Sequence, residues 1–348
     1  MILKAARALV GPDLLPTEDV SIAVEAGRIT ALDGNGDGEV LELGDLTLLP
    51  GFIDAHVHIG FADPADVLQG GVTTVRDLAW VPDDIFGLAE RSRGKSFRGP
   101  LVLCVGPMLT VESGYPTRAG WAPTGTGRAV TSADDAHAAV VENARRGAQA
   151  IKVGLNAQVG PTLDRDLLTA ICAAAHAIDL GVTAHIYGLG ELTKAIEAGV
   201  DELAHILMSP ESIPDEVIAA MVERSMVVIP TLSIFSGREL EVAVGNMARF
   251  VSAGGRVVYG TDLGNEGPGP GIDPLEIERM VAAGLDGHRV VTAATSDAAS
   301  HLGLASKGNL AAGYDADIIG VAGDPLTRPQ DLCDVRFVMR SGRIVERP

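Results

Sequence analysis

The chain contains little cysteine and few aromatic residues. Of its 348 residues, three are cysteines and 4% are aromatic. Cys104, Cys172 and Cys333 are too few and too scattered for a disulfide framework or a cysteine-based zinc site, so we expect buried free thiols. The hydrophobic residues are mostly Ala, Val, Leu and Ile, and 42 glycines accompany them. This composition indicates closely packed helices and strands that are joined by many turns.

Basic residues and long apolar runs are also scarce. The 27 Lys and Arg residues against 46 Asp and Glu residues give a formal net charge of -19, and no Lys/Arg-rich run stands out. This acidity argues against nucleic acid and anionic membranes as partners. No apolar run is long enough to span a bilayer, and the first residues, MILKAAR, lack the apolar core of a signal peptide. We therefore expect a soluble, cytoplasmic protein.

Both ends of the chain show short strand patterns. Residues 1–49 alternate apolar runs with turn signals, which predicts a small antiparallel β unit. Within it, DGNGDG at 33–38 has the composition of a calcium loop, but position twelve from Asp33 is Gly44 and not a glutamate, so we interpret the cluster as turns. Similar apolar runs between 309 and 348 lack partners of their own. We predict that 1–49 plus 309–348 form one small β-sandwich domain.

Residues 50–308 alternate strand and helix patterns. Apolar β runs lie at 52–56, 72–76, 101–105, 149–153, 182–186, 202–206, 226–230 and 256–261. Helical patterns lie at 134–147, 164–181, 190–199, 214–225, 238–253, 273–284 and 288–302. Eight strands with intervening helices predict an α/β fold, a (β/α)8 TIM barrel of parallel strands. A doubly wound sheet is the alternative, but no Gly-x-Gly-x-x-Gly turn follows the first strand.

The ionisable residues divide by the type of element that carries them. Four histidines lie within or at the ends of expected helices, where a structural role is the simpler interpretation: His137, His176, His288 and His301. Six other residues lie in or at the carboxyl ends of expected strands: His56, His58, Lys152, His185, His205 and Asp262. Barrels of the (β/α)8 type place their active sites at this face.

A metal ion explains why these polar residues gather there. Side chains alternate faces along a strand, so His56 and His58 point the same way, and two adjacent imidazoles can hold one divalent cation. A lysine such as Lys152 or an aspartate such as Asp262 is costly to desolvate in a barrel mouth unless something pairs with it. A divalent metal supplies that pairing, and we predict a metal centre.

Five motifs, in this order, resemble the amidohydrolase superfamily. They are PGFIDAHVH at 50–58, GVTTVRD at 71–77, ELAH at 202–205, GTD at 260–262 and GNLAAGYDADI at 308–318. The resemblance covers essentially the whole chain. Lys152 makes the chain similar to the binuclear branch, with imidazolonepropionase-like and prolidase-like members. The resemblance implies a hydrolase barrel over 50–308 and a β-sandwich built from both termini.

The resemblance also implies a metal ligand set. His56, His58 and Asp262 would hold the more buried of two divalent metals, and His185 and His205 would hold the second. Zinc is the expected metal.

Lys152 would bridge the two metals as a carboxylated lysine, formed when its neutral amine adds carbon dioxide. Two metals share a hydroxide, which acts as the nucleophile, and Asp262 would shuttle its proton to the leaving group. The alternative for Lys152 is an ordinary salt-bridging lysine beside a single metal.

A Gly- and Pro-rich loop at 106–131 follows the third strand, and loops of this length over a barrel mouth are usually functional. Prolidase-like relatives carry Thr-x-x-Gly-Gly-His-Gly here, and Tyr115 replaces the usual histidine. After the eighth strand, PGPGID at 268–273 lacks the histidine of the relatives' His-Gly-x-Asn motif. Both departures argue against a simple transfer of peptide specificity. Tyr115, Tyr187 and Arg118, whose planar fork suits a carboxylate, are the candidate substrate contacts.

The predicted activity is metal-dependent hydrolysis of an amide bond in a small-molecule substrate: a small peptide, an N-acyl amino acid or a cyclic amide. We do not expect an ordinary proteinase. An ester or lactone hydrolase, or a mononuclear deaminase on the same barrel, is the alternative within enzymes. A catalytically silent ligand-binding barrel is the rival from another class, but it would show a lost ligand, and none of the six is missing. The natural substrate, the native metal and the oligomeric state, including a homo-oligomer, stay open.

Overall fold

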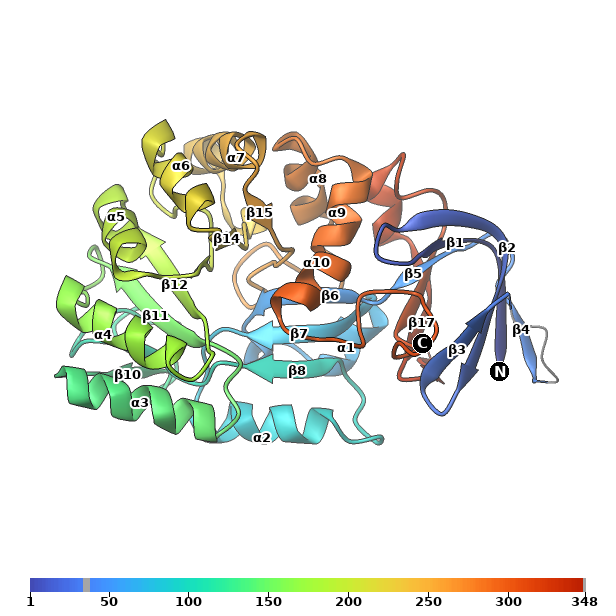
Figure 1. Cartoon of the computed structure of the whole chain (residues 1–348), viewed down its shortest axis with the longest axis horizontal. Coiled ribbons are helices and arrows are strands. Elements are labelled where there is room, and N and C mark those ends of the chain that lie inside the picture. Colours follow the sequence, from blue (N-terminus) through green and yellow to red (C-terminus); the bar gives the residue numbers. More distant parts are fainter. Residues whose placement is uncertain (34–37, 347–348) are drawn as a thin grey trace.

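The computed structural model describes residues 1–33 and 38–346. It is an α/β protein in which a large part with parallel strands and surrounding helices adjoins a smaller sheet that holds both chain ends (Figure 1). The parallel α/β architecture is therefore confirmed. Residues 34–37, the centre of the predicted turn cluster, lie outside the described residues.

Ten strands of the described residues form two parallel sheets. The first has the order β6-β7-β8, with bounds Phe52–Val57, Val72–Asp77 and Leu101–Cys104. The second has the order β10-β9-β11-β12-β13-β14-β15. Its strands span Gly127–Ala129, Met108–Thr110, Ile151–Asn156, Val182–Tyr187, Glu202–Leu203, Val227–Val228 and Arg256–Val257. The predicted loop at 106–131 thus contains two short strands, β9 and β10.

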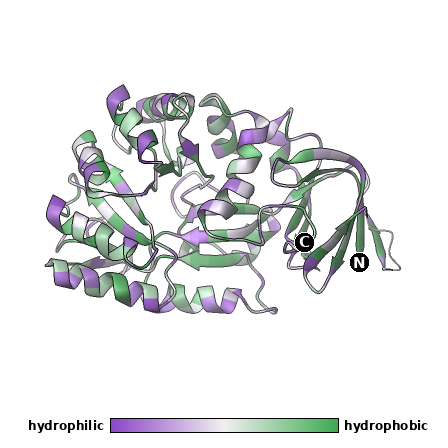
Figure 2. Ribbon diagram, in the orientation of Figure 1, coloured by the Kyte–Doolittle hydropathy of each residue, from purple (hydrophilic) through white to green (hydrophobic). Residues whose placement is uncertain are grey.

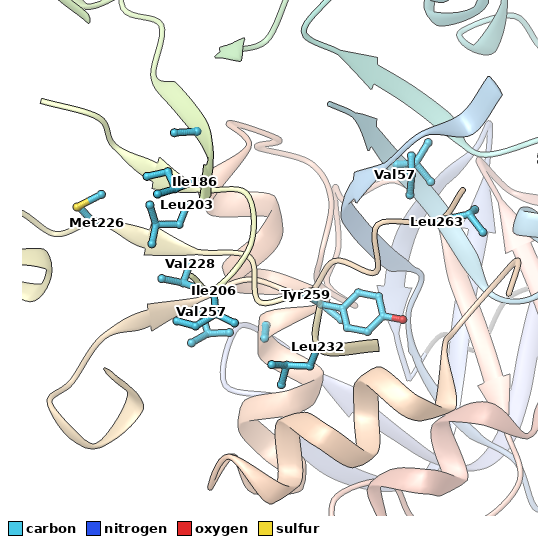
Figure 3. Packing of buried hydrophobic residues seen from close by; sticks show 14 of the residues in the cluster. Val57, Ile186, Leu203, Ile206, Met226, Val228, Leu232, Val257, Tyr259 and Leu263 are labelled. Carbon is cyan, nitrogen blue, oxygen red and sulfur yellow. The ribbon is translucent and has the colours of Figure 1, made fainter. Parts of the chain in front are cut away.

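Hydrogen bonds connect the two sheets beside the first strand. The amide of Ala55 donates to the carbonyl of Tyr259 at 3.0 Å, and the amide of Asp262 donates to the carbonyl of His56 at 2.8 Å. Val57 and Leu263 form an isolated parallel bridge, and Figure 3 shows their side chains close together. The segment after β15 therefore runs beside β6, although the described strands do not form one continuous closed ladder.

Three predicted strands are shorter than expected. The patterns at 202–206, 226–230 and 256–261 predict five or six residues, whereas β13, β14 and β15 each contain two. In the segments that follow the last two strands, Thr231 and Asp262 adopt positive φ angles of 46° and 60°, which are outside the extended conformation of a strand. Among the residues that follow these three strands, His205, Ile234 and Asp262 line the cavity described below.

Ten helices lie among the described residues. Their bounds are α1 Pro64–Gln69, α2 Pro82–Ser92, α3 Ala133–Arg145, α4 Arg165–His176, α5 Leu189–Ala198, α6 Asp215–Glu223, α7 Gly237–Ser252, α8 Pro274–Ala282, α9 Gly287–Ala293 and α10 Ser296–His301. Side chains cap several amino ends; Asp164, for example, accepts from the amide of Leu167. Along α3, hydrophobic and hydrophilic residues alternate (Figure 2), as expected for a helix with one buried face. The single helix predicted at 288–302 is wrong, because Thr295 has non-helical angles and separates α9 from α10.

The chain ends form one sheet with the order β18-β17-β16-β5-β1-β2-β3, and β4 also pairs with β1. The bounds are β1 Ile2–Val10, β2 Leu15–Glu25, β3 Arg28–Leu32, β4 Val40–Glu42, β5 Thr47–Pro50, β16 Ile318–Val321, β17 Val335–Arg340 and β18 Arg343–Ile344. Antiparallel pairing of β5 with β16 joins the two ends of the chain. A second layer, which would make this sheet a sandwich, stays a prediction.

The sequence pattern predicted an antiparallel amino-terminal unit, but two of its strand pairs are parallel. β4 and β5 both run parallel to β1, where Ile2 faces Val40 and Arg7 faces Thr47. The two short strands follow each other in one direction along the same edge of β1, because β2 already occupies the opposite edge.

Apolar side chains fill the space between the parallel strands and the helices. Ile186, Leu203, Val228 and Val257 project from neighbouring strands into one cluster (Figure 3). Full burial of such a side chain contributes about 1.5–3 kcal/mol, so this cluster holds the strand ends in fixed positions. No helix among the described residues is long and apolar enough to cross a membrane.

Candidate metal centre

Three buried side chains converge where β6 meets the segment after β15. His56 Nε2 lies 3.1 Å from Asp262 Oδ1, and His58 Nε2 lies 3.3 Å from the same oxygen. One potential ligand atom from each of the three residues lies within 4.8 Å of the others. This is a candidate metal-binding group, and it joins three of the six residues that the sequence singled out.

Backbone carbonyls orient both imidazoles of this group. His56 Nδ1 lies 2.6 Å from the carbonyl oxygen of Ala204, and His58 Nδ1 lies 3.1 Å from that of Ala79. A carbonyl oxygen only accepts, so in each neutral ring Nδ1 carries the proton and the lone pair of Nε2 faces Asp262.

The facing atoms of His56 and Asp262 are suited to bind a cation and not to pair with each other. His56 Nε2 and Asp262 Oδ1 are buried, and neither makes a hydrogen bond of acceptable geometry. A lone pair that faces a carboxylate oxygen leaves two acceptors without a donor, which is costly in a buried site. A divalent ion between them would satisfy both atoms, and imidazole nitrogen with carboxylate oxygen is a ligand set that zinc accepts.

His185 and His205 lie beside this group. The ring of His205 is 4.7 Å from that of His56 and 4.9 Å from that of His185, measured between centroids. His205 Nδ1 lies 2.8 Å from the hydroxyl of Thr231 and 3.8 Å from Asp262 Oδ2. His185 Nε2 lies 3.3 Å from the side-chain nitrogen of Asn156. Four histidines therefore share one buried site, although His185 and His205 are not part of the compact group.

Lys152 lies at the same site on β11. Its side chain is among the largest that are fully buried, with 1% of the residue exposed, and among the described residues it has no hydrogen bond or ion pair. Burial lowers its pKa to about 7, although the nearby carboxylates of Asp262 and Glu202 act in the opposite direction. An amine with this pKa is substantially neutral at pH 7, which is the form that can react with carbon dioxide.

Burial also shifts the pKa values of the other ionisable groups at the site. Burial lowers the pKa of His56 to about 4 and that of His185 to about 3, so both rings are neutral at pH 7 and able to bind a metal. Burial alone would raise the pKa of Asp262, but His56, His58 and His205 hold it well below its usual value. The site thus combines an ionised carboxylate with the neutral imidazoles of His56, His185 and His205. At His58, burial by itself would lower the pKa, but the Asp262 carboxylate beside it raises the pKa above its usual value.

Asp54 and Asp77 hold the segments that carry the candidate ligands, a role that the sequence did not reveal. Asp54 accepts from the amides of His56 and Thr261 at 3.0 and 3.2 Å, and from the hydroxyl of Thr261 at 2.6 Å. Asp77 accepts from the amides of Ile59 and Ala79 at 2.9 and 3.1 Å. Both aspartates belong to the motifs at 50–58 and 71–77, but residue type alone does not distinguish a clamp from a ligand.

A second buried charge network spans the parallel strands near the same site. The guanidinium of Arg76 on β7 donates to both oxygens of Glu202 on β13, at 2.7 and 2.8 Å, and to the carbonyl of Ala55 at 3.0 Å. Glu202 also pairs with His301, at the end of α10. The network therefore ties strands of both sheets to α10, and it gives His301 the structural role that its helical position predicted.

A cavity of about 60 Å³ opens at the candidate ligands. Its lining includes all six predicted ligands and Tyr115, together with Met108, Trp121, Met208, Ile234 and Asn265. The sequence did not single out these last five residues, because none of them belongs to one of the motifs at 50–58, 71–77, 202–205, 260–262 and 308–318. Arg118 and Tyr187 are not among the lining residues; Arg118 is exposed and donates to the hydroxyl of Ser113 at 2.9 Å.

Comparison with known proteins decides the family. The sequence model described as "Amidohydrolase family" matches residues 47–345. The chain belongs to the amidohydrolase family. An uncharacterized protein of Mycobacterium tuberculosis is 29% identical over 372 residues, which cover 94% of this chain and 93% of the relative. Ochratoxinase of Aspergillus niger is 24% identical over 378 residues, which cover 86% of this chain and 76% of that enzyme.

Solved structures share the amidohydrolase fold with this chain. A Xaa-Pro dipeptidase with bound methionine superposes with a TM-score of 0.85 at 20% identity, covering 99% of this chain and 98% of that one. A putative prolidase from Bifidobacterium longum gives a TM-score of 0.84 at 24% identity, covering 100% and 95%. Membership in this family supports a hydrolase with a small-molecule substrate, as the sequence motifs implied.

Proposed function

We propose that this protein is a metal-dependent hydrolase that cleaves an amide bond in a small molecule. The observation that carries the proposal is the buried pair of His56 Nε2 and Asp262 Oδ1, two acceptors 3.1 Å apart with no hydrogen bond of their own. Beside them, Lys152 is buried without an ion pair among the described residues. A cation between His56 and Asp262 would compensate the first feature, and carboxylation would turn the buried amine of Lys152 into an anionic ligand for a cation.

The ligand set suits two divalent ions, with zinc as the expected metal. His56, His58 and Asp262 would hold the first ion, and His185 with His205 the second. Lys152, once carboxylated, would complete the ligand set as an anionic oxygen ligand. When bound, the two ions polarise the scissile carbonyl and make a hydroxide available at neutral pH.

Asp262 is the residue that we expect to move protons. Its carboxylate is ionised, because the surrounding histidines hold its pKa well below the usual value. Its Oδ1 faces His56 and His58, while Oδ2 lies toward His205 at 3.8 Å. A carboxylate at this position can accept a proton from attacking water and return it to the leaving nitrogen.

The named relatives support hydrolysis, although none shows which bond this chain cleaves. A Xaa-Pro dipeptidase, an ochratoxinase and a molinate hydrolase share its fold. We also propose that residues 50–308 form the (β/α)8 barrel of this family and that 1–49 plus 309–348 form its small β domain. The hydrogen bonds between β6 and the segment after β15 support the barrel, and the pairing of β5 with β16 supports the β domain.

Hydrolysis by the zinc-reconstituted protein tests the proposal. Dipeptides, N-acyl amino acids and cyclic amides would be assayed beside matched esters and lactones, with wild type and Asp262→Asn compared. We expect amide hydrolysis that the substitution reduces by at least about a hundredfold, since general acid–base groups contribute on that scale. Asp166→Asn, at an exposed position of α4, is the matched control and should retain activity. Equal activity of Asp262→Asn and wild type would refute the proposed role.

A further inference from the structure

The cavity beside the candidate ligands has an apolar wall. Apart from the six proposed ligands, its lining residues are Met108, Tyr115, Trp121, Met208, Ile234 and Asn265, and none of them carries a charge. The side-chain amide of Asn265 is neutral, and one of its two N–H groups donates to the backbone carbonyl of Asp262 at 3.2 Å. An acidic protein with a net charge of -19 therefore presents an uncharged surface at this position.

Tyr115 and Trp121 are the main elements of this wall. The Tyr115 ring stacks on that of His185, with centroids 4.1 Å apart and an angle of 17° between the planes. The Trp121 ring lies 4.8 Å from that of His58, and its Nε1 donates to the Tyr115 hydroxyl at 3.2 Å. The hydrogen-bonded pair thus contacts His185 and His58, one candidate ligand of each proposed metal position.

Further aromatic rings support Trp121 from outside the cavity. Phe61 lies 6.4 Å from Trp121 and 4.7 Å from Trp80, measured between ring centroids. Aromatic residues make up only 4% of the sequence, and both of its tryptophans belong to this cluster. Such a concentration in one place indicates a surface for apolar contact.

Apart from the proposed metal ions, the cavity offers no cation for a substrate carboxylate. Its described lining contains no arginine, and its one lysine is the proposed ligand Lys152. Arg118, which the sequence suggested for this role, is exposed and donates to Ser113. A carboxylate placed against Trp121 or Met208 would lose hydration without gaining a partner, which is unfavourable.

Building on the proposed hydrolase function, we infer that Tyr115 and Trp121 select substrates whose group beside the scissile bond is uncharged and aromatic or aliphatic. Free dipeptides and N-acyl amino acids, which place a carboxylate near that bond, are disfavoured. The favoured class is uncharged amides, including N-aryl and cyclic amides. Contact with the indole and phenol rings supplies the binding energy through buried apolar area.

The size of the cavity makes Trp121 a reporter of binding. At about 60 Å³, it is far smaller than the roughly 300–1,000 Å³ of typical small-molecule sites. A ring-sized group enters only if side chains of the apolar wall shift, and it then lies against the indole of Trp121. Substrate binding therefore changes the surroundings of this indole, whether or not hydrolysis follows.

Binding of two matched probes tests the inference without relying on turnover. Acetanilide is an uncharged aromatic amide, and 4-acetamidobenzoate carries a carboxylate on the same ring. The full chain would carry Trp80→Phe, so that Trp121 is the only tryptophan, and would be tested both zinc-loaded and chelator-treated. We expect acetanilide to bind at least about tenfold more tightly in both forms and to change the Trp121 emission. Tighter binding of the carboxylate, no binding of acetanilide, or calorimetric binding without an emission change would overturn the inference.

Kinetics then separate this inference from the proposed function. Trp121→Ala should lower kcat/KM for acetanilide by about tenfold or more, but kcat/KM for acetamide by less than about threefold. Trp121→Arg should shift the preference between acetanilide and 4-acetamidobenzoate about tenfold toward 4-acetamidobenzoate. Tyr314→Ala is the control, since Tyr314 lies beside β3 of the terminal sheet and is not among the lining residues of the cavity. Faster hydrolysis of 4-acetamidobenzoate by wild type would refute the inference and leave the hydrolase intact. Preferential acetanilide binding with no hydrolysis of any amide would refute the proposed function and leave the inference intact.

Discussion

His56 and Asp262 come from the first parallel strand and from the segment after the last one, and their side chains meet with Nε2 3.1 Å from Oδ1. The backbone holds them there as well, because the amide of Asp262 donates to the carbonyl of His56 at 2.8 Å. The candidate metal group is therefore built at the seam where the two parallel sheets meet. Residues that secure this seam should affect metal binding without touching the metal.

Asp54→Asn tests the clamp across this seam. Asp54 accepts two hydrogen bonds from Thr261 and one from the amide of His56, and an amide side chain cannot accept all three in the same way. We expect zinc affinity to fall by about ten- to a hundredfold, as for other groups that orient ligands. Competition with a chromogenic chelator measures the affinity. Thr261→Ser, which keeps the hydroxyl, is the control and should stay near wild type; an unchanged affinity in Asp54→Asn would argue against the clamp.

Thr231→Val tests the orientation of His205. The hydroxyl of Thr231 lies 2.8 Å from Nδ1 of His205, and valine keeps the shape while removing the oxygen. We expect weaker binding of the second zinc ion, whereas the first, held by His56, His58 and Asp262, is retained. Stepwise zinc titration by calorimetry distinguishes the two. Thr231→Ser should bind like wild type, and equal loss of both ions in Thr231→Val would contradict separate positions.

Arg76→Met should be strongly destabilising, because it leaves Glu202 buried without its bidentate partner. Removing one member of such a pair costs about 3–5 kcal/mol. The double variant Arg76→Met/Glu202→Leu removes both charges and should be more stable than the single variant. Urea unfolding of the three proteins provides the comparison. A single variant as stable as wild type would show that the network contributes nothing to stability.

Acid should weaken the fold partly through Glu202. Burial by itself would raise the pKa of this carboxyl, but Arg76 and His301 hold it below the usual 4.5. The unfolded chain then binds a proton more readily than the folded protein, so the contribution of Glu202 is present above pH 4.5 and is lost as the pH falls below it. Unfolding free energy should decline more steeply below pH 4.5 in wild type than in Glu202→Gln. Parallel pH profiles would exclude this role of Glu202.

The sequence predicted the candidate metal ligands better than the other residues that line the cavity. The spacing of His56 and His58, and the strand-end positions of Lys152 and Asp262, follow from local periodicity, and the structure brings these residues to one cavity. Periodicity also located most helices within a few residues. It failed where tertiary contacts decide: Thr295 divides the last predicted helix, and β4 and β5 run parallel to β1.

Loop chemistry was the least predictable part of the molecule. Tyr115 stood out only as a departure from a motif, and Trp121 carried no signal at all. Its place follows from the hydrogen bond to the Tyr115 hydroxyl and the contact with His58, which are long-range packing and not local pattern. Arg118 looked suitable by residue type, but a neighbouring serine engages it at the surface.

The most direct test of the central claim is the number of divalent ions bound per chain. Wild type, Lys152→Ala and Lys4→Ala, whose lysine is exposed on β1, would be purified without chelator in the presence of bicarbonate and measured by elemental analysis. We predict about two zinc or similar ions in wild type and Lys4→Ala, and clearly fewer in Lys152→Ala, because the bridging ligand is lost. About one ion in all three proteins would contradict a bridged pair of metals at Lys152.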